Sequence, residues 1–160
     1  MAQALAARAA VPGFKASPAV HPIVFAAMLC CAAPVESAEE INYIHGVRTK
    51  EDSSVSPEAA LKMLREGNQR FVSEALASTT SFQPAEHREA LAVHGQNPMV
   101  AILGCADSRA PIEIVFDAQP GDCFVLRNAG NTLTHAEGSV VGSLEYCIGP
   151  LGAKLILVLG

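Results

Sequence analysis

The fold is decided by the stretch Pro98-Met99-Val100-Ala101-Ile102-Leu103-Gly104, which leads directly into Cys105-Ala106-Asp107-Ser108-Arg109. The first part is a continuous apolar run without polar alternation, as expected of a strand that is buried on both faces of a parallel sheet. In such sheets, reactive groups gather just beyond the carboxyl ends of the strands. Cys105, Asp107 and Arg109 supply a soft metal ligand, a hydrogen-bond acceptor and its charge partner. The sequence therefore predicts a metal site at the end of this strand.

Two more apolar runs follow the first one. Residues 123–127 predict a second strand after a Pro-Gly turn at residues 119–122, and residues 154–159 predict a third strand. Between these strands, apolar residues repeat every four positions over 140–148 and predict a helix that stops at Gly149. Strand, helix and strand in this order predict an α/β fold with a mostly parallel sheet and flanking helices.

Two helices are predicted before the first strand. The first begins at Pro57, with Ser56 as its cap, and reaches about Leu76. The second begins near Pro84 and stops at Gly95. The first helix is predicted to have an apolar stripe and a solvated face, comprising Leu61, Leu64, Phe71 and Val72 on the stripe and Asn68 and Arg70 on the solvated face.

The composition is that of one globular domain with an acidic balance. The chain has 160 residues, of which 50% are hydrophobic, and a formal net charge of −5. This charge does not favour nucleic acid as a partner, and an aromatic content of 5% without tryptophan does not favour a base-stacking surface. The five cysteines are an odd number without the spacing of a disulfide framework, which favours thiol or metal chemistry. We interpret Cys123 and Cys147 as small buried hydrophobic residues.

The amino-terminal segment has the composition of a targeting sequence. Residues 1–35 carry no acidic residue, and the apolar stretch 23–33 is too short to span a bilayer. We predict a targeting or transit segment over 1–38 with a plastid as its destination; a secretory signal and a disordered tail are the alternatives. Residues 39–55 are predicted to form an arm or linker, and residues 56–160 one domain without a stable membrane span.

Five motifs occur in a fixed order: Cys-Ala-Asp-Ser-Arg at 105–109, Pro-Gly-Asp at 120–122, Arg-Asn-Ala-Gly-Asn at 127–131, Ser-Leu-Glu-Tyr at 143–146 and the strand at 154–160. In order and spacing they resemble the β-class carbonic anhydrases. The resemblance implies the Rossmann-like fold of that family. It also implies zinc as the cofactor, held by the motif cysteine and by a histidine and second cysteine in a His-x-x-Cys loop directly after the strand that ends at Gly160. Neither of these two ligands is present, so we expect the chain to be an amino-terminal portion of such an enzyme.

The resemblance also implies roles for the residues of the first motif. Cys105 matches the first zinc thiolate, and Asp107 with Arg109 matches the carboxylate-guanidinium pair of the family. Asp107 then either accepts the hydrogen of a zinc-bound hydroxide or itself ligates zinc, and the sequence does not choose between these roles.

Three further residues match pocket positions of the family. Gln96 matches a glutamine that hydrogen-bonds carbon dioxide or bicarbonate, and Phe124 and Tyr146 match aromatic residues that reach across a dimer interface. Without the resemblance, Gln96 is interpreted as a surface loop residue and the two aromatic residues as core. His135 and Cys147 are not expected to ligate zinc. The resemblance implies a homodimer or a higher homo-oligomer.

The predicted function is the zinc-dependent, reversible hydration of carbon dioxide to bicarbonate and a proton. Two alternatives stay open at this point. One is an inactive fragment or interaction domain that keeps the sheet without a metal site, because one thiolate and one carboxylate fall short of a closed tetrahedral site. The other is a hydrolase of a sulfur analogue on the same fold.

Overall fold

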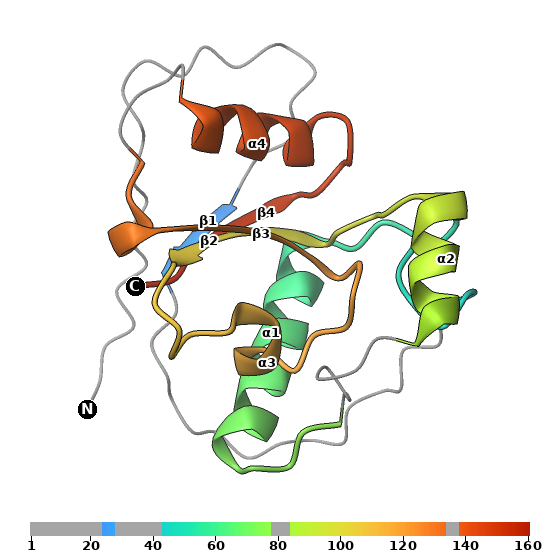
Figure 1. Ribbon diagram of the computed structural model, residues 1–160, viewed down its shortest axis with the longest axis horizontal. Helices are drawn as coiled ribbons and strands as arrows, with labels where there is room; N and C mark the ends of the chain where they lie inside the picture. The colour runs from blue at the N-terminus through green and yellow to red at the C-terminus, as the bar shows by residue number, and fades with distance from the viewer. Residues whose placement is uncertain (1–23, 28–42, 78–83, 134–137) are drawn as a thin grey trace.

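The computed structural model describes residues 24–27, 43–77, 84–133 and 138–160 (Figure 1). Its sheet has the strand order β1-β4-β2-β3, and all neighbouring strands are parallel. The four strands are β1 (Val24–Ala27), β2 (Val100–Cys105), β3 (Cys123–Asn128) and β4 (Leu155–Val158). The predicted α/β fold with a parallel sheet is therefore confirmed.

Apart from the backbone of β1, the predicted targeting segment 1–38 lies outside the described residues. The four residues of β1 come from the apolar stretch 23–33 and form the edge strand beside β4. The plastid destination stays a prediction. Within the described ranges, no helix is long and apolar enough to cross a membrane.

Helices cover both faces of the sheet (Figure 1). One face is covered by α4 (Ser139–Ile148), and the other by α1 (Pro57–Val72) together with the short α3 (Ile112–Val115). The helix α2 (Ala85–His94) lies beyond the end of the sheet at which β2 begins.

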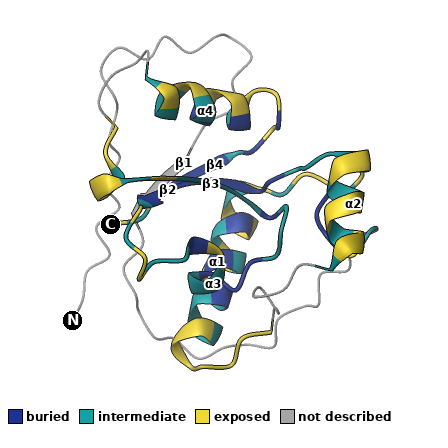
Figure 2. Cartoon of the chain, in the orientation of Figure 1, coloured by how far each residue is buried: buried dark blue, intermediate teal, exposed yellow. Residues whose placement is uncertain are grey.

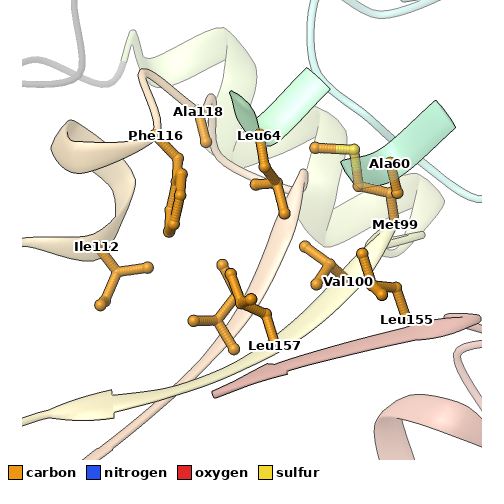
Figure 3. Close-up of a cluster of buried hydrophobic side chains, with 10 residues drawn as sticks. Ala60, Leu64, Met99, Val100, Ile112, Phe116, Ala118, Leu155 and Leu157 are labelled. Atoms are coloured by element: carbon orange, nitrogen blue, oxygen red, sulfur yellow. The ribbon is translucent and has the colours of Figure 1, made fainter. Parts of the chain in front are cut away.

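Alternating side chains of the strands divide the core into two layers. Val100 and Ile102 of β2 belong to the layer under α1 and α3, whereas Ala101 belongs to the layer under α4. This alternation follows from the two-residue period of a strand, and it requires apolar residues at every position because both faces are covered. Figure 2 shows the central strands buried and much of α2 exposed. Figure 3 shows the larger layer, in which side chains of α1, α3 and the strands meet, comprising Ala60, Leu64, Met99, Val100, Ile102, Ile112, Phe116, Ala118, Leu155 and Leu157.

The first helix begins where the sequence predicts and ends earlier. The side chain of Ser56 accepts a hydrogen bond from the backbone N–H of Ala59 at 3.2 Å, which caps α1. The helix ends at Val72, and Glu74 has a positive φ of 58°, so the chain turns away before Leu76. The predicted apolar stripe is therefore partly wrong. Phe71 and Val72 are exposed, and the buried residues of the helix are Ala60, Leu64 and Gly67.

The predicted solvated face of α1 is also wrong. The Arg70 guanidinium donates a hydrogen bond of 2.5 Å to the buried carboxylate of Asp117, and the Asn68 amide donates to the carbonyl of Val115 at 3.1 Å. Both side chains thus bind the segment around α3, which a one-dimensional helix pattern does not show.

The segment 43–56 packs against the domain. Val47, Arg48 and Thr49 are buried, and Thr49 forms an antiparallel bridge with Gln96. The Arg48 guanidinium donates to the carbonyl of Asn97 at 2.6 Å and to that of Ser53 at 2.5 Å. These bonds hold the segment at the entrance to β2.

We expect Gly67→Ala to lower the free energy of unfolding by about 2 kcal/mol, within the usual range for overpacking. A Cβ at this position would lie 1.8 Å from the carbonyl oxygen of Phe116, so α1 and α3 would have to move apart. The measurement is urea unfolding of the chain, followed by circular dichroism. Gly142→Ala in α4 is the matched control, since a Cβ there meets nothing within 4 Å. This control should gain about 0.5–1 kcal/mol from helix propensity, and equal effects of the two substitutions would contradict the close approach.

Candidate functional site

The loop after β2 is held by the end of β3. Cys105 lies opposite Asn128 in the register, and the N–H of Ala106 donates to the carbonyl of Asn128 at 2.8 Å. The Arg127 guanidinium donates to the carbonyl of Cys105 at 2.9 Å and to that of Asp107 at 2.6 Å. Two parallel strands that end together thus fix the backbone on which the predicted metal site lies.

The Cys105 thiol accepts a hydrogen bond from the backbone N–H of Asp107, with an N···S distance of 3.4 Å. This bond, assisted by the N–H groups of Gly130 and Ala106, lowers the pKa of the Cys105 thiol from its ordinary value. The side chain is half-buried at the edge of the sheet. The lowered pKa shifts the equilibrium of this thiol toward the thiolate, which is the form that binds a metal.

Asp107 and Arg109 form a bidentate pair. The Arg109 guanidinium donates from Nε to Oδ1 of Asp107 at 2.9 Å and from Nη2 to Oδ2 at 3.0 Å, and the Arg109 backbone N–H also donates to Oδ1 at 2.9 Å. These bonds lower the pKa of Asp107, which therefore stays ionised at neutral pH. Both carboxylate oxygens are engaged by Arg109 in this structure.

Three of the predicted site residues are therefore gathered in one loop, but they do not make a complete metal site. Among the described residues, the group of three side chains with ligand atoms close enough to hold a metal is His45, Glu51 and His94, which does not include Cys105 or Asp107. His135 lies outside the described residues.

The other three predicted residues lie toward the opposite end of the strands. Gln96 precedes β2, and Phe124 is paired in register with Ala101 near its beginning. Five residue steps separate Val100 from Cys105, so β2 alone holds the two ends roughly 17 Å apart at the usual rise per residue. A single chain therefore does not bring Gln96 next to Cys105.

Gln96 and Tyr146 line an open cleft of about 430 Å³. The Tyr146 ring is 6.3 Å from that of Phe124, and Tyr146 is 50% exposed, so its interpretation as a core residue is wrong. Gln96, which the sequence alone suggested was a surface loop residue, lies in the wall of this cleft. Lys50 lines the same cleft, although no sequence pattern indicated it.

The described cysteines Cys105, Cys123 and Cys147 are all free. Burial raises the pKa of the Cys147 thiol to about 12, and burial also raises the pKa of Cys123. Both thiols are therefore neutral near pH 7, in agreement with their interpretation as small hydrophobic residues.

Parts of this chain resemble known proteins. The family model "Carbonic anhydrase" matches residues 100–160. Carbonic anhydrase 2 of Mycobacterium tuberculosis is 45% identical over 107 residues, which are 67% of this chain and 49% of the relative. The mitochondrial beta carbonic anhydrase 6 of Arabidopsis thaliana is 36% identical over 78 residues, or 47% of this chain and 27% of the relative.

Among solved structures, a tetrameric beta-carbonic anhydrase of Sordaria macrospora aligns with 32% identity and a TM-score of 0.45, covering 56% of this chain and 45% of the other. The chain spans about half the length of the curated mycobacterial relative.

Alkylation should distinguish Cys105 from the buried cysteines. With its pKa below the ordinary value of 9.0 and that of Cys147 at about 12, Cys105 carries far more thiolate at pH 7.5. We expect Cys105 to react with iodoacetamide at least about tenfold faster than Cys147, after allowing for the lower nucleophilicity of the more acidic thiol. Peptide mass spectrometry of the chelator-treated protein measures both rates. Equal rates at Cys105 and Cys147 would show that the loop does not activate the thiol.

Proposed function

Because the chain belongs to the β-class carbonic anhydrase family, we propose that the complete native protein catalyses the reversible hydration of carbon dioxide to bicarbonate and a proton. The observation that carries this proposal is the loop after β2, in which an activated thiol and a carboxylate held by a guanidinium lie within five residues. These groups are a metal ligand and a hydrogen-bond acceptor, the two functions that hydration of carbon dioxide at a metal requires.

Zinc is the proposed cofactor. The described residues fit it in part: Cys105 offers a thiol whose lowered pKa favours the ligating form, and the ionised Asp107 carboxylate follows in the same loop as a hydrogen-bond acceptor. When bound, the ion supplies a Lewis acid that makes water nucleophilic near neutral pH. One thiolate leaves a tetrahedral site incomplete, so the proposal requires further ligands from outside the described residues.

Asp107 is proposed to orient the attacking water. Arg109 holds the carboxylate by two parallel hydrogen bonds and keeps it ionised, so that a remaining lone pair can accept a hydrogen bond from the water. Arg127 fixes the backbone on either side of this carboxylate. The observed pairing supports this orienting role over direct ligation, because both carboxylate oxygens already accept hydrogen bonds from Arg109.

A homodimer is proposed to complete the site. Gln96 and Tyr146 line a cleft at the end of the strands opposite Cys105, so a second copy of the chain is needed to bring these polar and aromatic groups to the thiol. In the proposed arrangement, the amide of Gln96 hydrogen-bonds carbon dioxide or bicarbonate, and Phe124 and Tyr146 form the apolar wall.

Asp107→Asn tests the orienting role. In the complete native protein we expect this variant to hydrate carbon dioxide at least about 100-fold more slowly, because an amide presents a donor where the water needs an acceptor. Stopped-flow hydration measures the rate, and elemental analysis should find the zinc content unchanged. The exposed Glu113→Gln on α3 is the matched control and should keep wild-type activity. A fully active Asp107→Asn variant would contradict the proposed mechanism.

A mixed-dimer experiment tests whether two chains share one site. Cys105→Ser and Gln96→Ala chains, each weakly active alone, are co-expressed with different affinity tags. A shared site leaves one intact pair, Cys105 of one chain with Gln96 of the other, in every mixed dimer. Purified mixed dimers should therefore recover about half of the wild-type activity, as two-fold symmetry requires. If each chain instead holds its own complete site, both sites of the mixed dimer carry a substitution, and its activity stays at the low level of the single variants.

A further inference from the structure

A group of metal-binding side chains lies away from the Cys105 loop. His45 and Glu51 belong to the segment 43–56, and His94 is the last residue of α2. The Nε2 atom of His45 lies 2.9 Å from Oε2 of Glu51, and the Nδ1 atom of His94 lies 2.7 Å from Oε1. The two imidazole rings are stacked, with centroids 3.9 Å apart and planes 14° from parallel.

The charges of this group favour a bound cation over two protonated histidines. One carboxylate cannot neutralise two imidazolium ions, and parallel rings 3.9 Å apart would place these like charges face to face. A neutral ring carries one N–H, and in the tautomer that places this proton on the nitrogen away from Glu51 the facing nitrogen has a lone pair free for a metal. The Glu51 carboxylate lies between the two rings, with one oxygen facing each.

The distances allow a metal after a small rearrangement. The three ligand atoms lie within 4.8 Å of one another. Ligand atoms about 2.0–2.1 Å from a tetrahedral zinc ion are roughly 3.3 Å apart, so the two N···O distances would have to lengthen by about half an ångström. The side chains are 27%, 30% and 49% exposed for His45, His94 and Glu51, so they can make this movement.

The backbone that carries these side chains is fixed. The Asp52 carboxylate accepts hydrogen bonds from the backbone N–H groups of Thr49 at 2.7 Å and Ile44 at 3.2 Å, which closes the turn between His45 and Glu51. The bridge from Thr49 to Gln96 then joins this turn to the chain two residues after His94. Ligands on a backbone fixed in this way need little ordering when the ion binds.

We propose that His45, Glu51 and His94 form a second metal site, with zinc as the ion that suits two imidazole nitrogens and one carboxylate oxygen. Water would complete the coordination, as in other zinc sites with two histidines and a glutamate. The neighbouring residues Lys50 and Gly95 line the cleft beside Gln96, so the ion would fasten the wall of that cleft to α2.

The test is zinc titration by isothermal calorimetry on the 160-residue chain carrying Cys30→Ser, Cys31→Ser and Cys105→Ser, which leaves only Cys123 and Cys147, the thiols whose pKa burial raises. We expect one zinc ion per chain. His94→Ala and the isosteric Glu51→Gln should each weaken binding by at least about tenfold, since even the outer partners of metal ligands are worth that much. His87→Ala, a histidine of the same helix outside the group, should bind zinc normally.

Hydrogen exchange provides a second measurement on the same proteins. Zinc should slow amide exchange in residues 44–52 and 91–96 of the titrated background, and it should have no such effect in Glu51→Gln, whose shape is preserved. Three results would overturn the proposal: no zinc binding by the background protein, equal affinity in Glu51→Gln, or a loss in His87→Ala as large as that in His94→Ala. The last result would show that zinc binds surface histidines without the geometry of the group.

Discussion

The pairing of β2 with a parallel neighbour on each side is the constraint on which the structure depends. β2 pairs with β3 over all six of its residues and with β4 through Ala101, Ile102 and Leu103. Because both faces are covered, its alternating side chains fill two core layers, and a slip of one residue would exchange them. The same register places Cys105 opposite Asn128, at the edge where the loop must begin. The position of the thiol is thus a consequence of core packing.

Two arginines stabilise the loop that follows in different ways, one through its backbone and one through the Asp107 side chain. Arg127, at the end of β3, binds the carbonyls of Cys105 and Asp107 and so fixes the backbone from the neighbouring strand. Arg109 binds the carboxylate of Asp107 from within the loop. The planar guanidinium suits both tasks, because its donors reach two acceptors at once. A lysine at either position would supply the charge without holding two acceptors in a fixed geometry.

The part of the structure that could be predicted from the sequence is the part that depends on local patterns. The buried strands follow from continuous apolar runs, and the Cys105 loop is local because its groups are only two residues apart. The contacts of Arg70 with Asp117 and of His94 with Glu51 join residues far apart in the chain, so no periodic pattern shows them. Tyr146 lies in a helix with an apolar repeat, which suggested a core position. Its ring is nevertheless exposed, because this part of α4 lines the cleft.

The segment 43–56 illustrates why a stretch without a period can still be part of the fold. Its Tyr43 hydroxyl donates a hydrogen bond of 2.5 Å to the buried carboxylate of Asp122, which also accepts from the N–H of Gln119 at 2.8 Å. Burial raises the pKa of Asp122, so the carboxylate depends on these donors to compensate for lost water.

Undocking the segment would break the bond of Tyr43 with Asp122 and that of Arg48 with Asn97, and a hydrogen bond to a charged group contributes about 1.5–3 kcal/mol to stability. The docked segment is therefore held largely by buried polar groups. An apolar stripe would have been visible as a periodic pattern in the sequence, but scattered polar contacts are not. Lys50, which lines the cleft, belongs to this segment, and Thr49 of the segment bridges to Gln96, which also lines the cleft. The cleft therefore exists only while the segment is docked. Loosening of residues 43–56 would therefore disturb the wall of the cleft beside Gln96.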